Sequence, residues 1–156
     1  MTVIAVISVL VDVSLRLLSV LNVMPKSILC AIDFSESSLN ALKWAAELSS
    51  KFNSHLTVLY PYRLIQSSKE DVVEIKKKNV ELATRKFEAL ENDYLNGKVT
   101  SFEFSPEIGF LSDRVEDHLR KNSILLMVIG KHMNTNSQEN LDDLINNVKV
   151  PVVVIP

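Results

Sequence analysis

Asp33 is the residue of this chain whose type and position best suit ligand binding. It ends a short apolar run, Ser27–Asp33, and the hydroxyl side chains of Ser35, Ser37 and Ser38 follow directly. In an open parallel sheet, ligands bind outside the carboxyl ends of the strands. We therefore expect a small polar site just beyond Asp33, with Ser35 and Ser37 as candidate ligand-binding residues beside it.

A second polar group follows another apolar run. Residues Ile124–Ile129 form the most hydrophobic run, Gly130 closes it, and Lys131 and His132 come next. If the two runs are neighbouring strands, Lys131 and His132 share the crevice of Asp33 and can help to hold an anion. The alternatives are that both are solvent-exposed loop residues, and that Asp33 caps the next helix or fixes the turn.

No spacing in the sequence supports a catalytic or metal site. Cys30 is the only cysteine and lies within an apolar run, which predicts a buried side chain and excludes a disulfide framework. The histidines at positions 55, 118 and 132 are far apart, and we interpret them as structural or surface residues. The sequence therefore favours a non-catalytic protein, with no catalytic and no metal-binding residues assigned.

The elements that position these residues alternate between strand and helix. We expect strands at Ser27–Asp33, His55–Tyr60, Val99–Ser105, Ile124–Ile129 and Val150–Pro156, and helices at Glu36–Phe52, Ser67–Leu95, Phe110–Lys121 and Asn140–Val148. Pro61 is expected to stop the second strand, and residues 106–109 to form a turn. Strict alternation predicts an α/β fold, a doubly wound parallel sheet with helices on both faces.

The helical periodicity also predicts which faces are buried. In the first helix Leu39, Leu42, Ala46 and Leu48 form an apolar stripe, which Trp44 and Ala45 widen. In the long second helix, apolar residues recur from Val72 to Tyr94, and the three lysines at 76–78 lie among acidic residues on a solvated face.

The composition describes one ordinary globular domain. The chain has 156 residues, of which 47% are hydrophobic and 23% charged. A net charge of −2 offers no electrostatic footprint for DNA or RNA, so we expect no nucleic-acid partner. With the first 24 residues set aside, the expected compartment is the cytoplasm.

Residues 1–24, MTVIAVISVLVDVSLRLLSVLNVM, form an apolar extension before the domain. The segment is about as long as a membrane span requires, but Asp12 and Arg16 interrupt it, and no basic residue precedes Arg16 as a signal peptide would require. Three interpretations stay open. Translation starts at Met24 and the extension is not native, the segment packs on the domain or on a partner chain, or it anchors the protein in a membrane.

Four stretches, taken in their order and spacing, resemble a universal stress protein domain over residues 25–156. They are Ile28–Ala46, His55–Tyr60, Gly109 with the helix that leads to Leu126–Gly130, and Val150–Ile155. The resemblance implies a five-stranded parallel sheet of order 3-2-1-4-5, a Rossmann-like fold of the adenine nucleotide alpha hydrolase type. That order places Asp33 and Gly130 side by side at the topological switch point.

The resemblance also bears on the ligand. Many family members bind ATP, with an aspartate at the position of Asp33 on the nucleoside. Their phosphates lie on a loop of the form Gly-x-x-Gly followed by a later Gly-Ser or Gly-Thr, because glycines let backbone N–H groups encircle them. This chain keeps Gly130 but has Met133 at the second glycine position, a shorter loop and no later glycine.

It therefore resembles the branch that does not bind ATP. We expect a non-catalytic binding or regulatory module of the stress response, without a cofactor. The alternative is a nucleotide-binding protein for ATP or AMP, or a weak ATPase, that uses Asp33, Gly130 and a remodelled loop.

The last strand predicts a homodimer. Its residues Val152, Val153, Val154 and Ile155 are apolar and β-rich, and natural proteins normally cover or pair such an edge. Members of the resembled family commonly dimerise by pairing this strand with its copy. A further protein partner is expected, but no motif identifies it.

Overall fold

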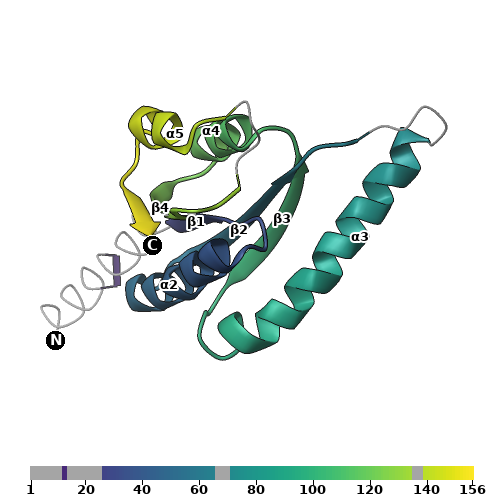
Figure 1. The fold of residues 1–156 in the computed structure, drawn as a ribbon. Coiled ribbons are helices and arrows are strands. Elements are labelled where there is room, and N and C mark those ends of the chain that lie inside the picture. Colours follow the sequence, from purple (N-terminus) through teal and green to yellow (C-terminus); the bar gives the residue numbers. More distant parts are fainter. Residues whose placement is uncertain (1–11, 14–25, 66–70, 135–138) are drawn as a thin grey trace, which may run out of the picture.

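The computed structural model describes residues 12–13, 26–65, 71–134 and 139–156 (Figure 1). The elements are β1 (Ser27–Ala31), α2 (Glu36–Phe52), β2 (His55–Tyr62), α3 (Val72–Leu90), a π-helical turn (Glu91–Leu95), β3 (Phe102–Ile108), α4 (Leu111–Lys121), β4 (Ile124–Gly130), α5 (Leu141–Asn147) and β5 (Val152–Ile155). The strands form one sheet of order β3-β2-β1-β4-β5, and every neighbouring pair is parallel. This confirms the predicted five-stranded α/β sheet of order 3-2-1-4-5.

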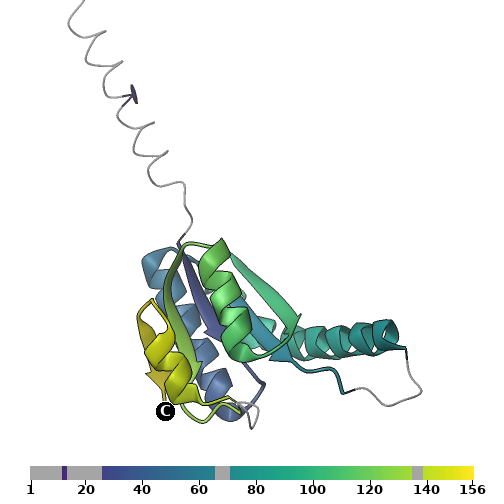
Figure 2. The same ribbon diagram turned by 90° about the horizontal axis from the view of Figure 1, so that it is seen from above.

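Helices cover both faces of the sheet, with α2 and α3 on one side and α4 and α5 on the other (Figures 1 and 2). Side chains of a strand alternate between faces, so β1 contributes Ile28 and Cys30 to the core under α2, and Leu29 and Ala31 to the core under α4 and α5. Because both faces are covered, every residue of β1 is buried. This explains why the first strand is apolar throughout.

Helix α2 has the predicted bounds because both of its ends are encoded locally. The Ser35 side chain accepts a hydrogen bond from the N–H of Ser38, and Asn53 ends the helix with a φ of 48°. The prediction that Trp44 widens the buried stripe was wrong, because this side chain is 55% exposed. Trp44 lies about 200° round the helix from the buried Leu42, on the solvent side.

The second strand does not stop at Pro61, as the sequence had suggested, but runs to Tyr62. The Leu59 carbonyl faces β1, where it accepts a hydrogen bond from Ile32. Groups two residues apart face the same side, so the donor that Pro61 lacks would also face that side. Because β1 ends at Ala31, opposite Leu59, no strand there requires a donor from Pro61.

Strand β3 is shifted by three residues from the predicted Val99–Ser105, and it includes Pro106, which we had expected in a turn. The Gly109 N–H donates to the Tyr62 carbonyl of β2, so odd-numbered residues of this stretch face β2. The nitrogen of Pro106 therefore faces the open edge of the sheet. The expectation of an edge strand is confirmed, and the edge position is what lets it contain a proline.

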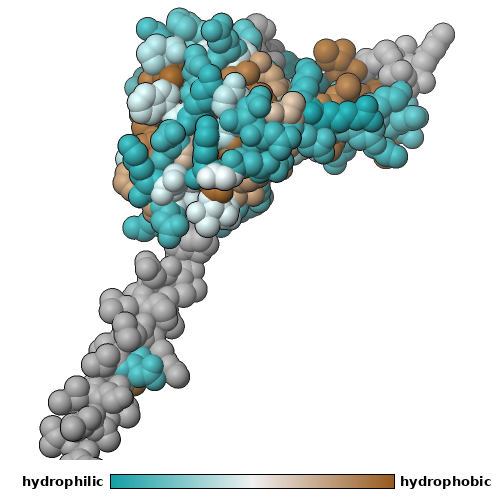
Figure 3. Space-filling view, turned by 90° about the horizontal axis from the view of Figure 1, so that it is seen from below, coloured by the Kyte–Doolittle hydropathy of each residue, from teal (hydrophilic) through white to brown (hydrophobic). Residues whose placement is uncertain are grey.

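Helix α3 begins at Val72, with Asp71 as N-cap, and its predicted last five residues form the π-helical turn. The predicted start at Ser67 lies outside the described residues. The end near Phe87 packs on the sheet, but the other end projects past it (Figure 2). Val72 is therefore 41% exposed where burial was expected, and Figure 3 shows apolar side chains along the projecting part.

Within the described residues, no helix is both long and apolar enough to cross a membrane. Of the segment 1–24, the structure describes Asp12 and Val13, which are helical. The three interpretations of this segment therefore stay predictions.

Candidate functional site

Asp33 follows β1 at the carboxyl edge of the sheet, and both of its carboxylate oxygens have protein partners. The Oδ1 atom accepts hydrogen bonds from the N–H and the hydroxyl of Ser35, the former at 3.0 Å. The Oδ2 atom accepts one at 2.7 Å from the N–H of Asn134, in the loop after β4. The carboxylate thus joins the turn after β1 to the loop after β4.

The electrostatics of Asp33 agree with this role. Partial burial raises the pKa of the carboxyl, but hydrogen bonds from Ser35, Ser38 and Asn134 outweigh burial and hold the pKa below its usual value. Asp33 is therefore a stable anion at neutral pH, and hydrogen-bond donors of its own chain stabilise the charge. It is not poised as an acid or base.

The two candidate serines also have partners within the protein. Ser35 is the N-cap of α2, and its hydroxyl bonds Asp33. The Ser37 hydroxyl accepts a 3.1 Å hydrogen bond from the N–H of His132. Ser35 and Ser37 therefore fix the start of α2 against Asp33 and against the loop after β4.

Gly130 provides the space for that contact. A Cβ atom at this position would lie 2.6 Å from the backbone carbon and oxygen of Ser37, a distance that real Cβ atoms essentially never show. Gly130 is buried at the end of β4, so the first turn of α2 packs directly against its backbone. The one glycine kept from the family's loop pattern has a packing role here.

Lys131 and His132 lie at the same edge, and both residues are exposed. Their backbone groups are engaged, since the Lys131 N–H donates to the Ile155 carbonyl at 2.7 Å and the His132 N–H to Ser37. The next residue, Met133, is buried and packs under the loop. The structure thus brings all six candidate residues to one edge of the sheet, while their role in ligand binding stays a prediction.

A cleft of ≈ 290 Å³ opens beside Asp33. Asp33 was predicted, but sequence reasoning missed other residues that line the cleft, which include Tyr60 and Tyr62 at the end of β2, Arg63 after it, Asn79 of α3 and Asn134. The strand order was the available signal, because β2 neighbours β1 and its carboxyl end therefore lies next to Asp33. Nothing in the sequence indicated that Asn79 would reach the cleft.

The cleft contains polar groups of two kinds. Among the described residues, the buried Tyr62 hydroxyl has no hydrogen-bond partner. Burial, and then the neighbouring Tyr60, raise the pKa of Tyr62, so its hydroxyl stays protonated and can donate. The Arg63 guanidinium lies 5.0 Å from the centre of the Phe110 ring and supplies a positive charge.

Glu139, near the end of the loop after β4, makes a second contact with another part of the chain. The Glu139 carboxylate accepts hydrogen bonds from the N–H groups of Leu111 and Ser112, at 3.1 and 2.9 Å, and from the Ser112 hydroxyl. Phe110, the N-cap residue of α4, supplies no side-chain cap of its own, so Glu139 caps this helix from a distant part of the chain.

The histidines are spread over the fold. His55 lies at the start of β2, 2.6 Å from the Ser101 hydroxyl, and His118 in α4 lies 2.7 Å from Glu107. His132 is at the opposite end of the sheet from His55. In the part of the chain that the structure describes, no three His, Cys, Asp or Glu side chains gather where they could hold a metal ion.

Comparison with known proteins identifies the family. The sequence model of the universal stress protein family matches residues 24–156. The search of curated proteins found no match. Among solved structures, universal stress protein UspA from Lactobacillus plantarum aligns with a TM-score of 0.69 at 19% identity, covering 86% of this chain and 100% of its own.

Two further solved structures show the same fold. Hypothetical protein MJ0577 aligns with a TM-score of 0.65 at 25% identity, covering 85% of this chain and 96% of its own. A universal stress protein in complex with cAMP aligns with a TM-score of 0.63 at 19% identity, covering 84% and 97%. Because the family match spans most of the chain and the sheet has the expected strand order, the chain belongs to the universal stress protein family.

Proposed function

We propose that this chain is a dimeric, non-catalytic binding or regulatory module of the stress response that acts without binding ATP. The observation that carries the proposal is the double engagement of Asp33, with Ser35 on one carboxylate oxygen and the Asn134 N–H on the other. A triphosphate cradle needs free backbone N–H groups. Here the N–H groups of His132 and Asn134 are turned inward, to Ser37 and Asp33.

Opening this loop for phosphates would be unfavourable. It would break both inward hydrogen bonds, each with a net contribution of about 0.5–1.5 kcal/mol, or more where the acceptor is charged. It would also expose Met133, which packs with the core under α4 and α5. We therefore infer that the closed loop is the resting state and that ATP does not displace it.

The dimer in this proposal uses β5. This strand pairs with β4 on one side and lies at the edge of the sheet. Val154 is 39% exposed there, an apolar residue on an uncovered edge. Pairing with β5 of a second copy would satisfy the open backbone groups and cover these valines. A cytoplasmic location, expected from the sequence, stays a prediction.

One observation favours the alternative of a nucleotide-binding protein. The cleft beside Asp33 holds the unpartnered Tyr62 hydroxyl and the Arg63 cation, and buried polar groups normally have partners. Its volume of ≈ 290 Å³ lies just below the roughly 300–1,000 Å³ of ligand pockets, which suits a nucleoside monophosphate better than a triphosphate. A structural neighbour solved with cAMP makes this the second candidate.

Thermal-shift titration of the full chain with ATP, ADP, AMP and cAMP distinguishes the two proposed functions. A ligand at about 100 Kd stabilises the native state by about 2.7 kcal/mol, which is readily measured. We expect no stabilisation by ATP. Stabilisation by AMP or cAMP that Arg63→Ala abolishes would support the alternative, whereas an ATP shift that Arg63→Ala and Lys131→Ala both reduce would overturn the main proposal.

A further inference from the structure

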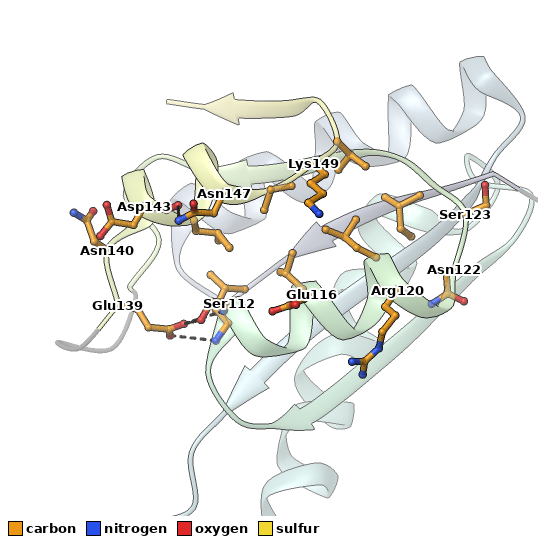
Figure 4. Close-up of a pocket in the computed structure, with 17 residues that line it drawn as sticks. Ser112, Glu116, Arg120, Asn122, Ser123, Glu139, Asn140, Asp143, Asn147 and Lys149 are labelled. Atoms are coloured by element: carbon orange, nitrogen blue, oxygen red, sulfur yellow. Dashed lines mark hydrogen bonds between the residues drawn. The ribbon is translucent and has the colours of Figure 1, made fainter.

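A groove of ≈ 810 Å³ lies between α4 and α5, on the face of the sheet opposite α2 (Figures 1 and 4). This volume falls within the roughly 300–1,000 Å³ that small-molecule sites occupy. The floor of the groove is apolar and includes the side chains of Leu119, Ile124, Val148 and Val150. Leu111 and Glu139 line both the groove and the cleft beside Asp33, so they lie between the two cavities.

The groove is open because α5 is short. Helix α5 has 7 residues and α4 has 11, about 10 Å and about 16 Å of length, while the 7 residues of β4 span about 23 Å. The first three residues of β4 are accordingly only partly buried, whereas its last four are buried. Leu119, Val148 and Val150 also stay partly buried. Apolar side chains therefore surround a space that no described residue fills.

The charged residues of the groove are divided along its length. The carboxylates lie nearer the start of α4 and belong to Glu116, Glu139 and Asp143 (Figure 4). The cations are Arg120, near the end of α4, and Lys149, which lies toward the same side and points into the groove. Arg120 is paired with Asp117 at 2.6 Å. Within the part of the chain that the structure describes, the Lys149 side chain forms no hydrogen bond and no ion pair.

An apolar floor beside one unpaired cation fits an amphipathic anion. The alkyl part of such a ligand would cover the partly buried floor, and its charged head would meet Lys149. A single lysine suits a head with one negative charge, because phosphate groups are commonly bound by arginines or by several donors at once. The three carboxylates oppose a second negative charge at the other end of the groove.

We propose that the α4–α5 groove binds a fatty acid, with the carboxylate on Lys149 and the alkyl chain along the floor toward the start of α4. This ligand needs neither a phosphate loop nor a free Asp33. The inference therefore goes beyond the proposed function and is compatible with a binding module that does not bind ATP. Because the two cavities are different, fatty-acid binding and the response to ATP can fail independently of each other.

Titration of the full chain with octanoate, decanoate and decanol tests the site, with each probe kept below the concentration at which it aggregates. We expect decanoate to shift the methyl resonances of Leu119, Ile124 and Val148 in NMR spectra. Burial of each CH₂ group tightens binding about fourfold, so decanoate should bind roughly fifteenfold more tightly than octanoate in calorimetry. The methyl groups of Val72 and Ile75, in the projecting part of α3, report adsorption to any apolar surface and should not shift.

Two variants distinguish the contact of the head from that of the chain. Lys149→Ala should weaken decanoate binding roughly two- to fivefold, as expected for an exposed ion pair, and leave decanol binding unchanged. Lys51→Ala, at an exposed position of α2, is the matched control. Leu119→Trp should fill the groove and abolish the binding of both probes, whereas Leu82→Trp, at an exposed position of α3, should not.

Four results would overturn the proposal. Groove methyls that do not shift with decanoate would exclude the site, and equal shifts on α3 would mean adsorption without a site. Equal affinities for octanoate and decanoate would exclude burial of the alkyl chain. An unchanged decanoate affinity in Lys149→Ala would remove the assigned contact of the carboxylate. Groove methyls that shift with protein concentration, in the absence of a probe, would show that the groove is a contact between copies of the chain.

Discussion

The carboxylate of Asp33 accepts a 2.7 Å hydrogen bond from the backbone N–H of Asn134, 101 residues further along the chain. The two residues follow β1 and β4, which are neighbours in the sheet, so the hydrogen bond joins the chain at the carboxyl ends of these two strands. In this chain, the aspartate that the family resemblance assigns to a ligand binds the loop itself.

Asp33→Asn should destabilise the domain. The substitution keeps the shape of the side chain but removes the charge, and it replaces one acceptor oxygen by an NH₂ group. Hydrogen bonds to charged groups contribute about 1.5–3 kcal/mol each, so we expect a loss of about 1–3 kcal/mol in urea unfolding. Hydrogen exchange should accelerate at residues 132–134. Asp93→Asn, at an exposed carboxylate, is the matched control and should change stability by less than about 0.5 kcal/mol. Unchanged exchange in the loop would contradict the role assigned to Asp33.

The same carboxylate should make stability depend on pH in the acid range. Because its pKa is lower in the folded protein than in the unfolded chain, its contribution is present above the unfolded value of about 3.9 and is lost as the pH falls through the folded pKa. The stability difference between the native chain and Asp33→Asn should therefore narrow as the pH falls below about 4. Unfolding curves measured between neutral and acid pH check this, and a constant difference would show that the ionised form has no special role.

Gly130→Ala should be strongly destabilising through a steric clash. The added Cβ would lie 2.6 Å from backbone atoms of Ser37, which cannot rotate away. Overpacking of this kind typically costs about 1–3 kcal/mol, measured by chemical unfolding. Gly97 is the contrasting control, because space is open around it and its φ is +77°. Because Asn tolerates a positive φ, Gly97→Asn should destabilise the domain less than Gly97→Ala. At Gly130 the order should be reversed, since the larger Asn side chain makes the clash worse.

Val154→Lys should prevent self-association if β5 forms the dimer contact. A lysine on an edge strand opposes edge-to-edge pairing, because its charge would be desolvated against a second copy. We expect a dimer for the native chain and a monomer for the variant in multi-angle light scattering at micromolar concentration. Val73→Lys, at an exposed position of α3, should leave the dimer intact. A native chain that is already monomeric would rule out the proposed dimer.

Elements whose ends depend on neighbouring residues could be predicted from the sequence. Helix α2 has the predicted bounds because Ser35 and Asn53 cap it within a few residues of its ends. The order of the strands followed from the family resemblance. The alternation of strands and helices predicted that the strands run parallel to one another. The first and fourth strands were found because burial on both faces makes them apolar throughout.

Features that depend on distant residues required the tertiary structure. Pro61 and Pro106 lie inside strands because their missing donors face positions where no neighbouring strand pairs, and the sequence near a proline does not contain that information. The cleft residues Tyr62 and Asn79 come from different elements and share no motif.

The sequence by itself determined the fold class, the family resemblance and the group of candidate residues around Asp33 and Gly130. These depend on periodicity and local spacing, which a linear pattern records. Only the tertiary structure decided what the candidates contact, with Asp33 on Asn134 and Gly130 against Ser37. Hydrogen bonds and close packing between residues about a hundred positions apart depend on where the sheet brings the strand ends together.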